Sequence, residues 1–279
     1  MLMLDTVRFA AMQARVRARV GKMPSPRQWE HIADAGDLAS LIERMRKNGL
    51  EFWLEDLPRE PDAAQLERHL RTRARYLVNW VARQLPAHWS AAARWLDVLP
   101  DLTIVRLLLK GEDVSSLVET GSVLHRVAES PIGQRKDILA ASSSYGPLVE
   151  GDGPLEERWW DLVVAGLPKA RGHEGAVLER TISALRDHRR GVRDLRRRLR
   201  QVGVDDEAHG AVVGQHAQWR LRDRLADQLR MLLAFGHPFH AVILILYSLM
   251  EFIQFERMRA LIISRAHNWA PESRFWGLR

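Results

Sequence analysis

The chain has 279 residues, 46% hydrophobic and 28% charged, a balance that excludes an intrinsically disordered protein and allows a core of ordinary size. The absence of cysteine excludes disulfide bonds, cysteine nucleophiles and thiolate metal sites. A net charge of +7 allows three anionic partners, namely nucleic acid, an anionic membrane surface or an acidic protein face.

The first twenty residues lack the order of basic head, apolar middle and cleavage site that marks a signal peptide. Strong helix formers dominate the whole sequence, and runs of alternating β-branched residues are nearly absent. We therefore expect an all-α fold. The first helix should run from Thr6 to Lys22, with Ser25 and Asp37 as N-caps of two short helices and Gly49 ending the second.

Further along the chain, Asp62 should cap a long helix that ends before Pro86. The stretch 142–154 is rich in helix breakers and predicts a loop. The remaining pattern predicts helices over 88–98, 102–111, 176–202, 208–235 and 239–265, and a weakly structured tail over 269–279.

The longest apolar run, AVILILYSLM, covers only ten residues, Ala241 to Met250, before Glu251 interrupts it. A membrane-spanning helix needs about 20 such residues. The run therefore predicts a core helix, and we expect a soluble protein whose contact with any membrane is peripheral.

An internal repeat is suggested by the segments 75–111 and 227–265. Each has an amphipathic helix, a proline break and a second helix with an aromatic residue, followed by a helix in which Arg106 corresponds to Arg259. The repeat predicts a first helical unit over 1–111, a shorter middle unit over 112–175 containing the 142–154 loop, and a closing unit over 176–279. The alternative is that any two amphipathic helices would align this well.

No nucleotide-binding or zinc motif occurs in the sequence. His237 and His240 flank a proline without a third ligand at helical spacing, so they predict a helix start rather than a metal site. Glu156 and Glu157 are adjacent, which favours a role at a helix N-terminus over paired acid–base catalysis. We expect no catalytic residue, no cofactor and no metal.

The run DHRRGVRDLRRRLRQ, 187–201, is the most basic segment. It could bind nucleic acid or anionic lipid. It could also be a solvated helix face, because its apolar positions form one narrow seam. Candidate partner contacts in this run and in the first helix are Arg15, Arg19, Arg193, Arg197 and Arg200.

Three segments carry a resemblance to a known family. They are RFAAMQARVRARVGKMPSPRQWEHIADAGDLASLIERMRK near the N-terminus, WLDVLPDLTIVRLLLKG in the middle, and YSLMEFIQFERMRALIIS near the C-terminus. Together they resemble the C-type (also called d-type) family of central-stalk subunits of rotary V-type and A-type ATPases. The sequence departs from the family at KNGLEFWLEDL, where Phe52 and Trp53 replace a Thr–x–Tyr element, and the chain is short for three full repeats.

The resemblance implies a funnel-like array of three similar helical units on the cytoplasmic face of the membrane rotor ring. Such a protein receives the central shaft and transmits torque for proton or sodium transport. It is not an enzyme, and its partners are the shaft and ring subunits rather than nucleic acid or a small-molecule substrate. The other two hypotheses are a basic helical nucleic-acid-binding protein and a helical adaptor of another complex.

Overall fold

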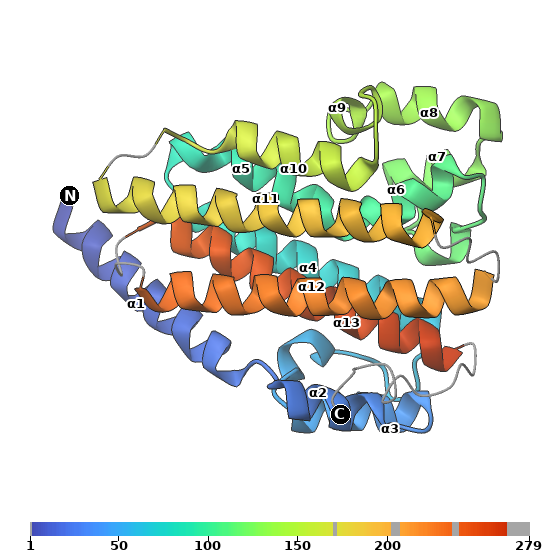
Figure 1. Ribbon diagram of the computed structural model, residues 1–279, viewed down its shortest axis with the longest axis horizontal. Coiled ribbons are helices and arrows are strands. Elements are labelled where there is room, and N and C mark those ends of the chain that lie inside the picture. The colour runs from blue at the N-terminus through green and yellow to red at the C-terminus, as the bar shows by residue number, and fades with distance from the viewer. Residues whose placement is uncertain (1, 170–171, 202–206, 236–239, 267–279) are drawn as a thin grey trace. The chain divides into compact units, whose positions relative to one another are not determined.

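The computed structural model describes residues 2–169, 172–201, 207–235 and 240–266 (Figure 1). Every regular element in these ranges is a helix, which confirms the predicted all-α class. The chain divides into two compact units: unit 1 combines residues 1–52 with 169–279, and unit 2 contains residues 53–168. The boundaries predicted from the repeat, after 111 and 175, do not coincide with these, and the division into three similar units stays a prediction.

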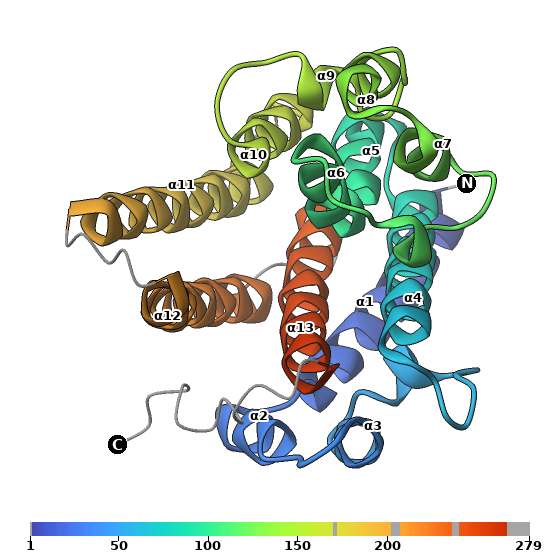
Figure 2. The ribbon, with the colours of Figure 1, turned by 90° about the vertical axis from the view of Figure 1, so that its right-hand side faces the viewer.

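Unit 1 brings together the two ends of the chain. Its helices are α1 (Leu2–Lys22), α2 (Pro26–Ala33), α3 (Leu38–Lys47), α11 (Gly172–Gln201), α12 (Glu207–Phe235) and α13 (Val242–Ala266). A 3-10 turn, η1 (Glu51–Leu54), contains the boundary with unit 2. The long helices α11 and α12 lie side by side, and α13 packs against α1, α3, α11 and α12 (Figures 1 and 2).

Unit 2 consists of shorter helices around one long one. In chain order they are α4 (Ala63–Gln84), η2 (Ala87–Trp89), α5 (Ser90–Val98), η3 (Leu99–Asp101), α6 (Leu102–Leu109), η4 (Ser115–Leu117), α7 (Val123–Glu129), α8 (Ile132–Ala140), α9 (Gly146–Val149) and α10 (Leu155–Gly166). Helix α5 packs against both α4 and α10. Trp159 of α10 is buried and donates a hydrogen bond from Nε1 to the Trp95 carbonyl at 2.6 Å.

The predicted helix caps are confirmed. The side chains of Ser25, Asp37 and Asp62 each accept a hydrogen bond from the backbone N–H three residues on, and each completes a reciprocal capping box. Gly49 follows α3 with a φ of +86°, and a Cβ there would lie 2.1 Å from the Lys22 carbonyl oxygen. Only glycine meets both conditions, so this residue fixes how the chain leaves α3 beside the end of α1.

The predicted loop over 142–154 is wrong in its centre. Residues 146–149 form the helical turn α9, and Tyr145, Leu148 and Val149 are buried. Pro147 stands in the first turn of this helix, where its missing N–H costs no hydrogen bond. Apolar burial therefore outweighs the breaker composition of the segment.

Helix α13 forms the core of unit 1. All ten residues from Ala241 to Met250 are buried, as the sequence predicts for a core helix. A helix that is apolar on every side is typical of an element surrounded by others. None of the helices in the described ranges is sufficiently long and apolar to cross a membrane.

Candidate functional site

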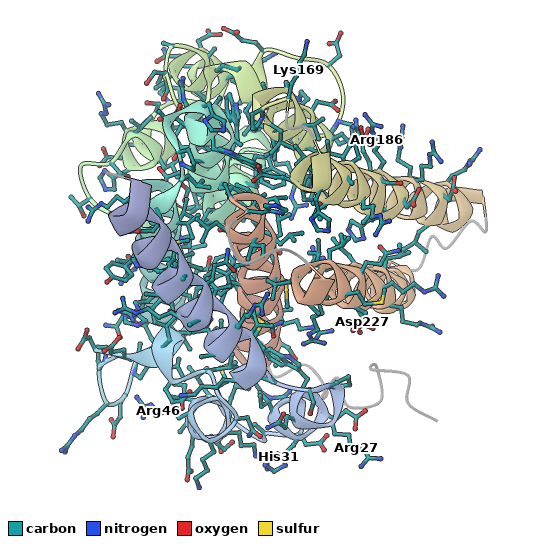
Figure 3. All side chains as sticks on the ribbon, turned by 90° about the vertical axis from the view of Figure 1, so that its left-hand side faces the viewer. Arg27, His31, Arg46, Lys169, Arg186 and Asp227 are labelled. Atoms are coloured by element: carbon teal, nitrogen blue, oxygen red, sulfur yellow. The ribbon has the colours of Figure 1, made fainter. Side chains whose placement is uncertain are left out.

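Helix α11 presents a row of arginine side chains to solvent. Arg186, Arg190, Arg193 and Arg197 are all exposed, and Figure 3 shows Arg186 at the surface of unit 1. Their spacing of four, three and four residues places them on one face of a helix with 3.6 residues per turn. We call these four residues the arginine ladder. It includes two of the predicted contact residues, Arg193 and Arg197.

The predicted contact residues in α1 have different surroundings. Arg15 is exposed, whereas Arg19 is half-buried and turned toward α13. Arg19 Nε lies 3.4 Å from Oε1 of Glu251, and its guanidinium stacks over the Phe52 ring at 3.6 Å from the centroid. Tyr247 donates a hydrogen bond to the same Glu251 oxygen at 2.7 Å. Arg19 therefore balances a buried carboxylate inside unit 1.

The Glu251 carboxylate in turn affects Tyr247. Burial and the neighbouring negative charge both raise the pKa of the Tyr247 hydroxyl, while Arg19 opposes this shift. The hydroxyl consequently stays protonated and keeps donating its hydrogen bond. This arrangement holds α1 against α13.

Further polar contacts join the first helices to α13. Trp29 of α2 donates from Nε1 to Gln254 Oε1 at 2.9 Å, and both side chains are buried. Arg265, near the end of α13, donates to the carbonyl of Ala33. These residues lie more than 220 positions apart in sequence. The N-terminal and C-terminal segments thus form one packed body.

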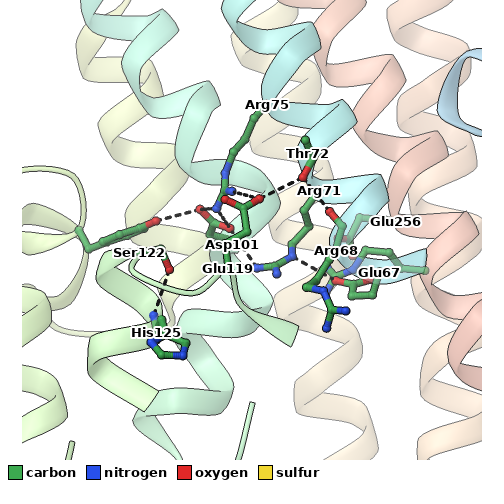
Figure 4. Close-up of polar contacts among 12 residues, drawn as sticks. Glu67, Arg68, Arg71, Thr72, Arg75, Asp101, Glu119, Ser122, His125 and Glu256 are labelled. Carbon is green, nitrogen blue, oxygen red and sulfur yellow. Dashed lines mark hydrogen bonds and ion pairs between the residues drawn. The ribbon is translucent and has the colours of Figure 1, made fainter. Parts of the chain in front are cut away.

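A second polar cluster lies within unit 2 and centres on Asp101, which is 2% exposed (Figure 4). Its carboxylate accepts hydrogen bonds from Arg75 Nη2 at 2.9 and 3.0 Å, Arg71 Nη1 at 3.4 Å and Tyr145 Oη at 2.8 Å. Arg75 also contacts Glu119 at 3.3 Å. Arg71 and Arg75 belong to α4, Asp101 ends η3, and Tyr145 directly precedes α9. The hydrogen bonds to Asp101 therefore join these three parts of unit 2.

Arg106 and Arg259, the corresponding positions of the proposed repeat, have different environments. Arg106 is exposed and pairs with Glu156 at 2.9 Å. Arg259 is 5% exposed and pairs with Glu256 at 2.9 Å. Glu156 and Glu157 do lie in the first turn of α10, as predicted. The two arginines each join an ion pair, one exposed and the other buried.

Some predictions fall outside the described residues. They concern His237, the side chain of Arg200 and the tail over 269–279. Within the described part of the chain, no group of three or more His, Asp or Glu side chains could hold a metal ion.

The predicted contact residues leave out Arg190, which lies within the basic run 187–201, and Arg186, which lies just before it. The spacing of the arginines is the signal that could find them. Sequence reasoning also misses the role of Asp101, which looks like an ordinary residue before a helix. No signal in the sequence identifies its three donors, since they come from positions 26 to 44 residues away.

Among the described residues, the buried polar side chains join helices within each unit, and the arginine ladder forms an exposed basic row on α11. Comparison with known proteins finds no matching family model, no matching curated protein and no matching solved structure.

Proposed function

We propose that this protein is a non-catalytic subunit of the central stalk of a rotary V-type or A-type ATPase. In this role it links the central shaft to the membrane rotor ring and transmits torque for ion transport. It would lie on the cytoplasmic face of the membrane, bind ring and shaft subunits, and take neither nucleic acid nor a small-molecule substrate. The funnel-like arrangement of three similar helical units is part of the same proposal.

One observation supports the proposal most directly. The N-terminal and C-terminal segments that resemble the family pack together, through α1, α2, α3 and α13. Their contacts include the Trp29–Gln254 hydrogen bond and the Arg19–Glu251 ion pair. The two terminal segments that carry the resemblance are therefore also ones that build unit 1.

The physical character of unit 1 suits the transmission of force. A torque adaptor has to resist shear between its two interfaces, and close-packed helices are stiff. If α2 slid along α13, buried hydrogen bonds such as Trp29–Gln254 would break and leave their donors and acceptors unsatisfied. The free-energy cost of these unsatisfied groups opposes sliding. Exposed arginines such as Arg15 suit a surface near lipid headgroups and acidic loops.

Co-purification tests the proposal. Tagged full-length protein should recover ring and shaft subunits when co-expressed with them. Arg15→Glu should reduce that recovery, whereas Arg46→Glu, the same charge change at an exposed position of α3, should leave it unchanged. Recovery of neither ring nor shaft subunits with the unmodified protein would overturn the assignment.

A second candidate is a helical adaptor of another complex, which the exposed arginine ladder of α11 favours. An adaptor needs a rigid body with at least one chemically distinctive surface, and unit 1 offers both. Co-purification separates the two candidates, because the adaptor would be recovered with proteins other than ring and shaft subunits.

A further inference from the structure

The outer surface of α11 follows a seven-residue pattern. Residues 186–192 read RDHRRGV and residues 193–199 read RDLRRRL. Arginine recurs at the first, fourth and fifth positions, aspartate at the second, and an apolar residue at the seventh. A solvated face needs no such periodicity, whereas a helix in contact with another helix over its length commonly has it.

The inner side of the repeat is occupied by α12. His188 Nδ1 lies 3.2 Å from the Leu221 carbonyl oxygen. At Gly191 a Cβ would lie 2.7 Å from Leu221 Cδ2, so the two helices approach closely there. Because this inner side of α11 already packs against α12, it is not available for insertion into a lipid bilayer. A partner on α11 must bind to the opposite side.

The opposite side carries both signs of charge. The four arginines of the ladder are exposed, and so are Asp187 and Asp194. Asp187 Oδ1 lies 3.9 Å from Arg190 Nη1, and Asp194 pairs with Arg197. Ion pairs this exposed contribute little to stability, so exchanging them for contacts with an external partner costs little.

We propose that the arginine ladder, together with Asp187 and Asp194, binds an acidic helix of another protein that lies along α11. Each heptad advances about 10.5 Å along the axis, so a partner helix with the same repeat keeps its register over the whole contact. Four arginines against two aspartates select a partner that is acidic overall. Guanidinium groups also match carboxylates in bidentate geometry.

The aspartates distinguish this partner from the other anionic surfaces. An anionic lipid surface or a nucleic acid carries a net negative charge, and each exposed aspartate would be repelled by it. A protein helix can instead place a lysine opposite each aspartate. The proposal is independent of the rotary assignment, since such a helix could belong to a stalk subunit or to any other protein.

The test compares four probes by fluorescence anisotropy with the full-length protein at physiological salt. The first probe is a three-heptad helical peptide with two glutamates and one lysine per heptad, spaced to face the arginines and aspartates. The second has the same composition in scrambled order. The third and fourth are phosphatidylserine vesicles and a short DNA duplex. We expect the matched peptide to bind at least about tenfold more tightly than the scrambled one.

Variants identify the surface. Arg186→Glu/Arg193→Glu should weaken binding of the matched peptide by about tenfold or more, while Arg27→Glu/Arg46→Glu, an equal charge change on α2 and α3, should not. Circular dichroism confirms that each variant keeps its helices. Asp187→Lys/Asp194→Lys should also weaken binding of the matched peptide, because the new lysines face the lysines of the peptide, although the variant makes α11 more basic.

Three results would overturn the proposal. They are equal binding of the matched and scrambled peptides, tighter binding of the matched peptide by the aspartate variant, and tighter binding of vesicles or DNA than of the matched peptide. The last result would identify a lipid surface or a nucleic acid as the partner. Because no rotary subunit takes part in this assay, its outcome does not depend on the co-purification experiment.

Discussion

The buried Arg135 side chain of α8 caps the C-terminal ends of two helices, α6 and α7. Its guanidinium donates hydrogen bonds to the carbonyl oxygens of Leu108, Glu112, Ala128 and Ser130, at 3.0 to 3.2 Å. Leu108 and Ala128 lie in the last turns of α6 and α7, whose final carbonyls have no partner within their own helix. The positive charge also complements the negative ends of both helix dipoles.

Replacing this side chain should be costly even when the charge is kept. Arg135→Lys should lower the free energy of unfolding by about 2–3 kcal/mol, because an ammonium group cannot reach four carbonyls in fork geometry and leaves some of them unsatisfied. Denaturant unfolding measures the loss. Arg126→Lys, an exposed position on α7, is the control and should change stability by less than about 0.5 kcal/mol. A loss no larger than that of the control would contradict the role assigned to Arg135.

The environment of His188, in contrast, opposes a positive charge on its side chain. Burial against α12 and the nearby Arg222 guanidinium lower the pKa of His188 to about 4. The ordinary value of about 6.5 applies in the unfolded chain. The folded protein thus binds fewer protons than the unfolded one between these two values, so this contribution to folding stability is complete above about pH 6.5 and falls as the pH drops toward about 4.

His188→Gln should make this acid-side decline shallower. The shift corresponds to about 3 kcal/mol of stability lost across the window from about pH 6.5 to about 4. Unfolding free energies measured at half-unit pH steps test the slope in both proteins. The exposed His31 of α2 provides a control, and His31→Gln should leave the slope unchanged. If the slope stays the same in His188→Gln, the buried environment of this histidine is not the cause.

At the scale of the elements, the close packing of α5 against α10 requires a residue without a side chain at position 166. At Gly166, the last residue of α10, a Cβ would lie 2.9 Å from the backbone C of Ala91 and the backbone N of Ala92. These are backbone atoms, which cannot turn aside as a flexible side chain can. The absence of a side chain therefore sets the separation of the two helices.

Gly166→Ala should push α10 away from α5 and lower the unfolding free energy by about 1–3 kcal/mol, the usual range for overpacking. Gly133→Ala in α8 is the matched control, since no atom lies within 4 Å of its added Cβ. There the better helix propensity of alanine should raise stability by up to about 1 kcal/mol. Thermal unfolding of the two variants side by side should show shifts of opposite sign, and a stabilised Gly166→Ala would disprove the close approach.

The sequence predicts these elements well where local chemistry decides the structure. Ser25, Asp37, Asp62 and Gly49 are recognisable because their effect reaches only three or four residues along the chain. The turn α9 escapes prediction because tertiary burial overrides its composition. For the candidate site, spacing can reveal the whole arginine ladder, but the donors of Asp101 depend on how distant helices pack.

At the scale of the whole molecule, the two units differ in how the chain builds them. Unit 2 is one continuous segment, and it contains the Asp101 cluster, the Trp159–Trp95 hydrogen bond and the carbonyl partners of Arg135. Unit 1 is assembled from two segments separated by residues 53–168. A continuous segment of this size, with polar groups satisfied internally, is expected to fold alone.

A fragment of residues 53–168 should therefore fold by itself, with a helical circular dichroism spectrum and a cooperative thermal transition. A fragment of residues 1–52 should not, because the partners of Trp29 and Arg19 on α13 are absent. The amide dispersion of each fragment in two-dimensional NMR gives an independent measure of order. An unfolded 53–168 fragment would show that unit 2 is not autonomous.

The contacts between the first helices and α13 also have a consequence for biosynthesis. Trp29 emerges from the ribosome long before Gln254, its buried hydrogen-bond partner. At the usual elongation rate of about 5–20 residues per second, the 225 residues between them take on the order of 10–45 seconds, during which the N-terminal helices wait for α13. Their apolar surfaces are exposed to solvent and to other nascent chains during that interval. Cellular yield should therefore depend on chaperones that shield the N-terminal segment until translation ends.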